Sequence, residues 1–185
     1  MTQMIEIIER YSIPDLPTTD DLPGKDGIPL ETNWHRIQIN LLIEIVQQMW
    51  RGLQNFVVGG NMFVYYSLQQ VRSRDYKGPD FFVVKEIDGS YSREKWVVWE
   101  ENGRYPNVIV ELLSPSTAEE DLGKKKDLYE RIFHTSEFFC YDPGSGELWG
   151  WELQKDGYTA LKPNAQEWMW SSELRAWVGI WEGEY

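Results

Sequence analysis

The chain has 185 residues, of which 42% are hydrophobic, and it carries a net charge of −12. That apolar share argues against wholesale disorder, and the length fits one compact domain over residues 1–185. Its one cysteine, Cys140, excludes an intramolecular disulfide framework and a zinc site made of cysteines. No apolar run reaches about 18 residues and no signal-peptide pattern opens the sequence, so we expect a cytoplasmic protein without a membrane partner.

The acidic charge lies in the two flanks of the sequence. Residues 1–33 hold seven acids and two bases (−5), and residues 136–185 hold nine acids and three bases (−6). The middle, residues 34–135, holds fourteen acids and thirteen bases (−1). An acidic protein is a poor match for nucleic acid, but the nearly neutral middle segment weakens that objection.

The first third of the sequence predicts an arm and then a helix. Residues 12–30 contain four prolines with several acids and glycines, so residues 1–30 are expected to form an N-terminal segment and extended arm. From Asn33 to Arg51, apolar residues recur at helical spacing, with Thr32 or Asn33 as the expected N-cap.

Short apolar runs after this helix predict strands. Phe56–Val58 and Met62–Tyr66 flank Gly59-Gly60-Asn61, which predicts a β-hairpin. Trp96–Trp99 predicts a further strand. Together with a second helix beyond residue 117, this mixture predicts an α/β (α+β) chain whose mixed β-sheet is flanked by helices.

Two acidic side chains lie within apolar runs, where a charge is costly unless something positive compensates it. Asp80 opens the apolar part of Gly78–Val84, and Glu111 lies inside Asn107–Ser114. Both runs have the β-branched or aromatic content of buried strands. Neighbouring strands would bring the two carboxylates to one divalent cation, and oxygen ligands favour Mg²⁺, with Mn²⁺ as the alternative.

The helix after Glu111 contains a lysine in an unexpected place. Thr117 and Glu120 have the spacing of a capping box. At about 100° per residue, Lys125 falls in the middle of the apolar arc and Asp121 lies one turn earlier on the same face. Lys124 and Lys126 fall on the borders of the arc, which consists of Leu122, Leu128, Tyr129, Ile132 and Phe133. We therefore expect Lys125 to point inward and Tyr129 to be a packing residue.

Tryptophans are concentrated late in the chain. Trp149 and Trp151 alternate at a spacing of two, as do Trp168 and Trp170, so each pair is expected on one face of a strand. Such tryptophan pairs usually belong to a core or a dimer interface, and stacking on nucleic-acid bases is the more specific alternative. Residues 144–185 are accordingly expected to add extra C-terminal β-strands.

These motifs, in this order, resemble those of the PD-(D/E)XK nuclease superfamily, which has the restriction-endonuclease-like fold. The closer resemblance is to its Uma-type branch of endonucleases, formerly classed as a domain of unknown function. The matching residues are Glu111, Ser114, Pro115, Ser116, Thr117, Asp121, Lys125 and Tyr129. Glu137–Pro143 loosely matches a further family element, and His35 resembles the early histidine of the branch. The resemblance covers roughly Leu30 to Pro143 and implies a nuclease-like core over residues 31–143.

The resemblance implies a metal-dependent endonuclease acting on DNA. Asp80 and Glu111 would be catalytic and hold the metal together with the backbone carbonyl of Leu112. The superfamily's usual lysine position is Leu113 here, which implies that the catalytic lysine has moved to Lys125. Supporting roles would fall to Asp121, His35 and Glu31, with Glu44 as another candidate for a third acid.

Several basic residues are candidates for contacts to DNA phosphates: Arg72, Arg74 and Lys77, just before Asp80, and Lys124 and Lys126. A merely solvated basic loop is the competing interpretation of the first three. Because duplex cleavage usually requires two active sites, we expect a homodimer. Two other function classes stay open: a catalytically inactive, dimeric binding or regulatory protein on the nuclease fold, and a tryptophan-rich ligand-binding module.

Overall fold

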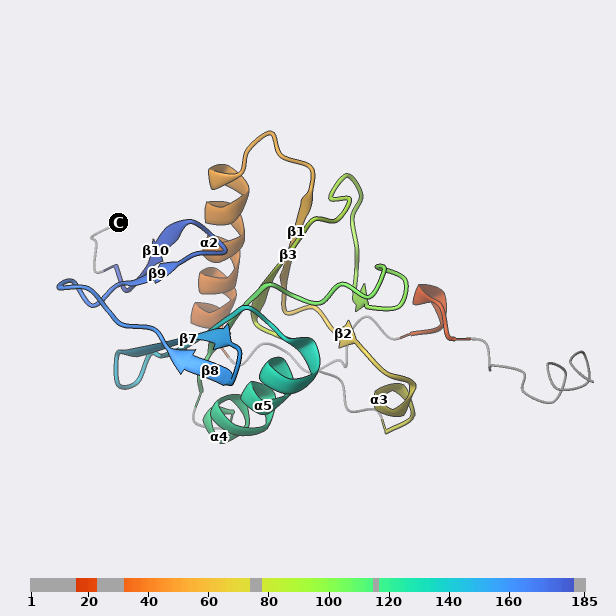
Figure 1. The fold of residues 1–185 in the computed structure, drawn as a ribbon. Helices are drawn as coiled ribbons and strands as arrows, with labels where there is room; N and C mark the ends of the chain where they lie inside the picture. Colours follow the sequence, from red (N-terminus) through yellow and green to blue (C-terminus); the bar gives the residue numbers. More distant parts are fainter. Residues whose placement is uncertain (1–15, 23–31, 74–77, 115–116, 182–185) are drawn as a thin grey trace, which may run out of the picture.

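The structure, a computed structural model, describes residues 16–22, 32–73, 78–114 and 117–181. Its centre is a six-stranded sheet with the strand order β1-β3-β5-β6-β7-β8 (Figure 1). The strands are β1 (Phe56–Gly60), β3 (Phe81–Lys85), β5 (Val108–Leu112), β6 (Glu137–Asp142), β7 (Glu147–Gln154) and β8 (Gly157–Ala160). Strands β5 and β6 are parallel and the other neighbours are antiparallel, which confirms the predicted mixed sheet.

The two faces of this sheet pack against different helices. Val110 of β5 packs in one cluster with Val46 of α2 (Asn33–Met49). Ile109 packs in another cluster with Tyr129, which lies on a second helix at residues 118–133. Because side chains alternate along a strand, Glu111 shares the face of Ile109 and points toward this second helix.

Helix α2 forms where the sequence predicts it, although it ends two residues earlier than expected. Thr32 is its N-cap, and the Thr32 side chain accepts a hydrogen bond from the backbone N–H of His35 at 3.3 Å. This cap fixes the start of the helix and holds His35 in its first turn.

The hairpin predicted over residues 56–66 is wrong. Strand β1 pairs with β3, whereas β2 (Val64–Tyr65) pairs in parallel with β4 (Trp96–Val97) in a separate two-stranded sheet. The two glycines interpreted as a turn lie inside β1. A Cβ atom on Gly59 would lie 2.3 Å from the ring of Phe82, and one on Gly60 would lie 2.5 Å from Ile39. The glycines therefore allow close packing on both faces of an edge strand.

The second helix, residues 118–133, contains two π-helical stretches and is called the composite helix below. It runs through α4 (Ala118–Glu120), the π segment η2 (Asp121–Lys125), α5 (Lys126–Leu128) and the π segment η3 (Tyr129–Phe133). Thr117 precedes it but makes no capping hydrogen bond, so the predicted capping box does not form. The wider π turns also shift the helical phase, which leaves Leu122 and Ile132 exposed on the surface rather than on the apolar arc.

The remaining described elements are short. They are a 3₁₀ turn, η1 (Thr19–Asp21), within the predicted arm; α3 (Leu68–Ser73); and a hairpin of β9 (Met169–Ser171) and β10 (Ala176–Val178). The predicted C-terminal strands are present, and β7 and β8 extend the central sheet, whereas β9 and β10 form a sheet of their own. Trp168 precedes β9, so Trp168 and Trp170 do not form the predicted strand pair.

Candidate active site

Asp80 and Glu111 lie side by side at one end of the central sheet. Asp80 directly precedes β3, and the pairing of Phe81 with Val110 sets it beside Glu111 of β5. The backbone N–H of Leu112 donates to Asp80 Oδ2 at 2.8 Å, and the backbone N–H of Asp80 donates to Glu111 Oε2 at 3.3 Å. The antiparallel pairing of β3 and β5 thus brings the two predicted carboxylates together.

Lys125 reaches this pair from the composite helix. Its Nζ lies 3.2 Å from Glu111 Oε1 and 2.6 Å from Asp121 Oδ1. Glu111 is 0% exposed and Asp121 is 1% exposed, so both carboxyl groups are held almost entirely out of water. The π segment η2 contains both Asp121 and Lys125, and π turns are frequent at functional sites.

Tyr129 also belongs to the site, which the sequence interpretation missed. Its hydroxyl donates a hydrogen bond to Glu111 Oε1 at 2.6 Å, and the residue is fully buried. The signal in the sequence is the spacing of four that links Asp121, Lys125 and Tyr129. In an α-helix, four residues overshoot a full turn by about 40°, whereas the wider π turns reduce that drift. All three side chains therefore face the same carboxylate region.

Burial controls the protonation of this cluster. Desolvation raises the pKa of Asp80, although the hydrogen bond from the Leu112 N–H opposes the shift. Desolvation likewise raises the pKa of Glu111 to about 8, against the lowering effect of the Lys125 charge. Burial alone would lower the pKa of Lys125, but the charges of Glu111 and Asp121 outweigh it and raise that pKa. Lys125 therefore stays a cation, surrounded by carboxylates that are costly to ionise.

His35 links helix α2 to the same end of the sheet. Its Nε2 lies 3.2 Å from the carbonyl oxygen of Leu112, and its Nδ1 lies 2.8 Å from the hydroxyl of Thr32. A carbonyl can only accept, so Nε2 carries a hydrogen and donates it to Leu112, while Nδ1 pairs with the Thr32 hydroxyl. His35 therefore orients the backbone oxygen that the sequence interpretation assigned to the metal.

The donor set fits Mg²⁺ better than a softer metal. The carboxylates of Asp80 and Glu111 lie together, and Leu112, whose N–H bonds Asp80, follows Glu111 directly. Mg²⁺ typically uses one or two carboxylates while keeping several waters. Three acids, Asp80, Glu111 and Asp121, surround one base, Lys125, which gives the ionised cluster a charge of −2. Among the described residues, no group of three or more His, Cys, Asp or Glu side chains is arranged to hold a metal.

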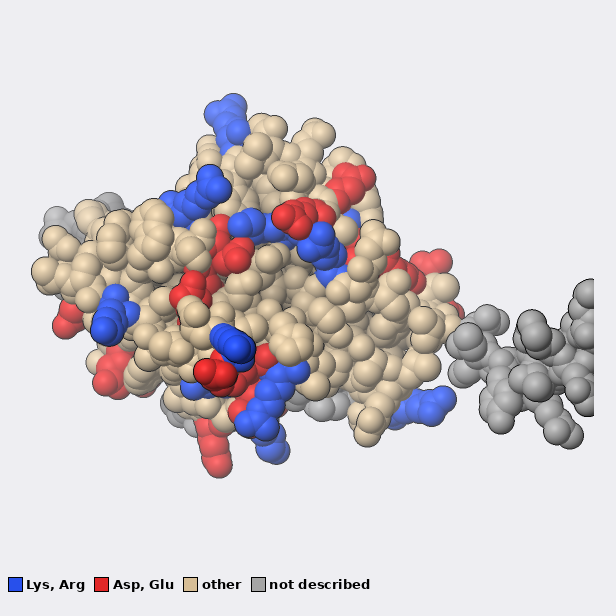
Figure 2. Space-filling view, in the orientation of Figure 1, with Lys and Arg blue, Asp and Glu red and all other residues tan. Residues whose placement is uncertain are grey.

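The other predicted site residues are not gathered at the cluster. Lys124 is exposed, and Lys126 places its Nζ 4.1 Å from the ring centroid of Trp151, in a cation–π contact. Arg72 is exposed on α3, and Glu44 is exposed on α2. The predicted residues Glu31, Arg74 and Lys77 lie outside the described residues. On the face in Figure 2, acidic and basic side chains are interspersed rather than gathered into one basic surface.

The tryptophan-rich segment is mostly packing. Trp149 and Trp151 pack against the core on the composite-helix side of the sheet, and the Trp151 ring stacks on Phe138 with centroids 5.5 Å apart. Trp170 and Trp177 differ, because both are nearly half exposed on the β9–β10 hairpin, with ring centroids 5.4 Å apart. Trp149 and Trp151 thus form a partly buried pair, whereas Trp170 and Trp177 form a surface pair.

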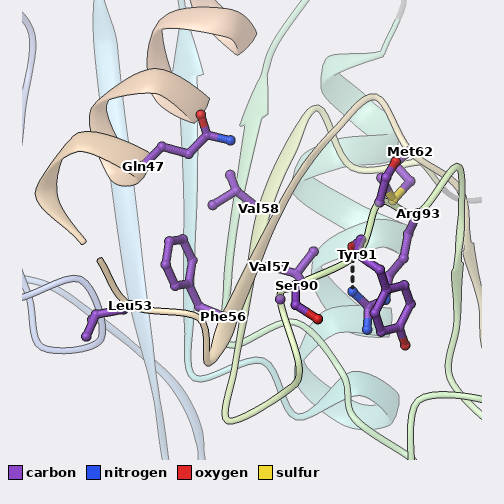
Figure 3. Close-up of a pocket in the computed structure, with 11 residues that line it drawn as sticks. Gln47, Leu53, Phe56, Val57, Val58, Met62, Ser90, Tyr91 and Arg93 are labelled. Carbon is purple, nitrogen blue, oxygen red and sulfur yellow. Dashed lines mark hydrogen bonds between the residues drawn. The ribbon is translucent and has the colours of Figure 1, made fainter. Parts of the chain in front are cut away.

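A separate pocket of about 400 Å³ lies beside the other end of β1 (Figure 3). Phe56, Val57 and Val58 line it, whereas Asp80 adjoins the Gly60 end of the strand, where its carbonyl accepts from the Asn61 N–H. Arg93 borders the pocket but is paired with Glu101 at 2.5 Å. This pocket is therefore not part of the carboxylate cluster.

The fold and the cluster define a nuclease-like domain of the restriction-endonuclease-like class. A solved structure from Anabaena variabilis, titled "a putative nuclease belonging to DUF820", matches with a TM-score of 0.52 and 12% identity. The match covers 86% of this chain and 92% of the other, and at this identity it shows the fold. No curated protein matches the chain.

The family model for Uma2, described as "Putative restriction endonuclease", matches residues 25–181. The chain therefore belongs to the Uma2 family, as the resemblance of its motifs predicts. No helix in the described ranges has the length and apolar content needed to span a membrane.

Proposed function

We propose that this protein is an endonuclease that hydrolyses phosphodiester bonds in DNA with Mg²⁺. The observation that carries the proposal is the position of Lys125 Nζ, 3.2 Å from the Oε1 atom of Glu111, whose other carboxylate oxygen accepts from the backbone N–H of Asp80. Family membership and the nuclease-like fold support the reaction class.

The charge of the cluster supports a requirement for a divalent cation. Buried acids without enough positive charge are costly, and the raised pKa values of Asp80 and Glu111 reflect that cost. One divalent cation would balance the −2 of the ionised cluster. Asp80, Glu111 and the Leu112 carbonyl would hold it, whereas Tyr129 and Lys125 already engage Glu111 Oε1.

The residues of the site would then have separate roles in catalysis. When bound, Mg²⁺ supplies Lewis-acid polarisation of the phosphoryl oxygen and lowers the pKa of a coordinated water. Lys125 would donate to the negative charge that develops on the phosphate oxygens and orient the attacking water. Asp121 would hold the lysine head in place, and His35 would hold the Leu112 carbonyl.

The position of Leu113 supports the moved lysine. Leu113 is 2% exposed and lies on the same face of the β5 chain segment as Glu111, packed in the core on the composite-helix side. Lys125 approaches that face from the helix, which supports a role for its ammonium group in place of the usual strand lysine.

Cleavage of supercoiled plasmid DNA tests the proposal. We expect nicking or linearisation with Mg²⁺ or Mn²⁺ and none with EDTA. Asp80→Ala should abolish cleavage in a protein that still unfolds cooperatively, whereas Glu44→Ala, at an exposed acid on α2, should cut like the wild type. A wild-type protein that binds Mg²⁺ and never cuts would favour an inactive binding protein on this fold.

A homodimer is the second part of the proposal, because cutting both strands of a duplex needs two active sites. The exposed pair Trp170 and Trp177 offers one apolar contact surface. Light scattering should give a dimer mass, which Trp170→Glu should reduce. A monomer mass at every concentration would contradict this part.

A further inference from the structure

A second cavity, called here the His35 pocket, adjoins the carboxylate cluster. It has a volume of about 660 Å³, within the range of small-ligand sites. The described residues that line it are Thr32, Trp34, His35, Leu113, Ser114, Ala118, Asp142, Pro143 and Gly144. They come from the start of α2, the ends of β5 and β6, and the start of the composite helix.

The pocket and the proposed catalytic centre share a wall. His35 lines the pocket, and its Nε2 contacts the carbonyl oxygen of Leu112, one residue after Glu111. Leu113 and Ser114 continue the same chain segment into the pocket. Ser114 is three residues beyond Glu111, so the two lie within about 11 Å of each other, a separation that a few nucleotides span.

The lining favours a flat, uncharged aromatic group over a phosphate. Trp34, Leu113, Ala118 and Pro143 are apolar, and none of the described lining residues is Lys or Arg. The charged lining residue is Asp142, whose pKa is lowered by hydrogen bonds from the Gly144 N–H and the Ser145 hydroxyl. An ionised carboxylate repels phosphate and accepts hydrogen bonds from amino groups, such as the exocyclic amine of cytosine.

Trp34 provides the stacking surface. Its ring stands at 89° to the His35 ring, with centroids 5.2 Å apart, and it packs against Tyr141 at 5.9 Å. These two contacts hold the indole in one orientation while it still lines the cavity. A rigid aromatic face in a concave site suits an unstacked base, since a base within a duplex has both faces covered.

We propose that the His35 pocket binds one unpaired nucleobase of the DNA strand, a few nucleotides from the bond that is cut. This inference rests on the proposed nuclease function and narrows its substrate to DNA with an unpaired base, either single-stranded or opened locally. The backbone passes the carboxylate cluster while the base enters the pocket and stacks on Trp34.

Binding of base-bearing and abasic oligonucleotides tests this proposal. Fluorescein-labelled single strands of about 12 nucleotides, one of deoxycytidine and one of abasic residues, have the same phosphate charge. Anisotropy titrations with Ca²⁺ in place of Mg²⁺ measure affinity during slow or absent hydrolysis. The wild type should bind the deoxycytidine strand about ten-fold more tightly than the abasic strand, as expected for one stacked base.

Changes at two lining residues, Trp34 and Ala118, locate the effect in the pocket. Trp34→Ala should remove the ten-fold preference and Trp34→Phe should keep most of it, whereas Trp181→Ala, at a tryptophan that is 81% exposed, should leave it unchanged. Ala118→Leu narrows the pocket without touching Trp34 and should also remove the preference. Equal wild-type affinity for the two strands, or a preference lost only in Trp181→Ala, would overturn the proposal.

Cleavage of the same oligonucleotides with Mg²⁺ separates this inference from the proposed function. Cleavage without a base preference would agree with the proposed nuclease activity but contradict base binding in the His35 pocket. A base preference that depends on Trp34, without any cleavage, would establish base binding at the pocket and contradict the proposed nuclease activity.

Discussion

Two buried ion-pair clusters in this protein differ in how their charges are balanced. Arg93 pairs with Glu101 through two hydrogen bonds, at 2.5 and 3.0 Å, and it also donates to the backbone oxygens of Asp88 and Tyr91. Lys125 instead contacts Glu111 and Asp121 and lies near Asp80. The first cluster is neutral, whereas the second would carry two negative charges in excess when all three of its acids are ionised. A balanced pair needs only a structural explanation, whereas the unbalanced cluster supports the proposed divalent cation.

The largest expected effect comes from removing the Lys125 ammonium group from the unbalanced cluster. Lys125→Ala should reduce the rate of DNA cleavage by on the order of 10²–10³, because one positioned donor to the transition state is lost. Metal affinity should change little, since the lysine acts on charge that develops during the reaction. Single-turnover cleavage assays and metal titrations measure the two quantities.

Lys124 and Lys126 supply matched controls for this change. Lys124→Ala and Lys126→Ala should weaken DNA binding modestly and reduce its salt dependence while leaving turnover nearly intact. Equal, mild defects in all three variants would mean that the lysine run is only a basic surface.

Disrupting the balanced cluster of Arg93 and Glu101 should lower the stability of the protein but leave its affinity for metal unchanged. Arg93→Met leaves Glu101 buried without its partner and should lower the free energy of unfolding by about 3 kcal/mol. Urea denaturation measures that loss, and calorimetry should find Mg²⁺ affinity unchanged. A loss of Mg²⁺ binding in folded Arg93→Met would remove the distinction between the two clusters.

The unbalanced cluster should also make the stability of the protein depend on pH. Glu111 has a pKa of about 8 in the folded protein, against an ordinary value of 4.5. Between these values the folded state holds a proton that the unfolded state has lost, so stability falls as pH rises, by at most about 1.4 kcal/mol per unit. Glu111→Gln should flatten this slope in metal-free urea denaturation. Wild-type stability that rises over this range would show that Glu111 is already ionised.

The smallest expected effect concerns Tyr129. Tyr129→Phe removes one hydrogen bond to Glu111 and should lower metal affinity or turnover by about ten-fold. Tyr158→Phe is the matched control, because the Tyr158 hydroxyl donates to the backbone oxygen of Thr135 at 2.9 Å. Both variants should lose about 1 kcal/mol of stability. A functional loss of the same size in both would assign Tyr129 to packing alone.

The sequence predicted the features of the site that depend on local pattern. Acids within apolar runs indicated Asp80 and Glu111, because burial of a carboxylate demands compensation wherever the strand lies. The inward position of Lys125 also follows from its phase on the helix, although the π turns changed that phase enough to expose Leu122 and Ile132.

Features that depend on tertiary contacts were missed. Gly59 and Gly60 have the sequence of a turn, but the rings and methyl groups that pack against them lie elsewhere in the chain, on Phe82 and Ile39. Tyr129 falls on the apolar arc, where an aromatic residue predicts packing, and its hydrogen bond exists because Glu111 lies opposite on β5.

Calorimetric titration with Mg²⁺ or Mn²⁺ tests most directly whether the unbalanced cluster is a cation site. The account predicts that the wild type and Arg93→Met bind the ion with similar affinity and that Asp80→Ala, still folded, does not bind it. A wild type that takes up no ion, or an Asp80→Ala variant that binds as the wild type does, would contradict the account.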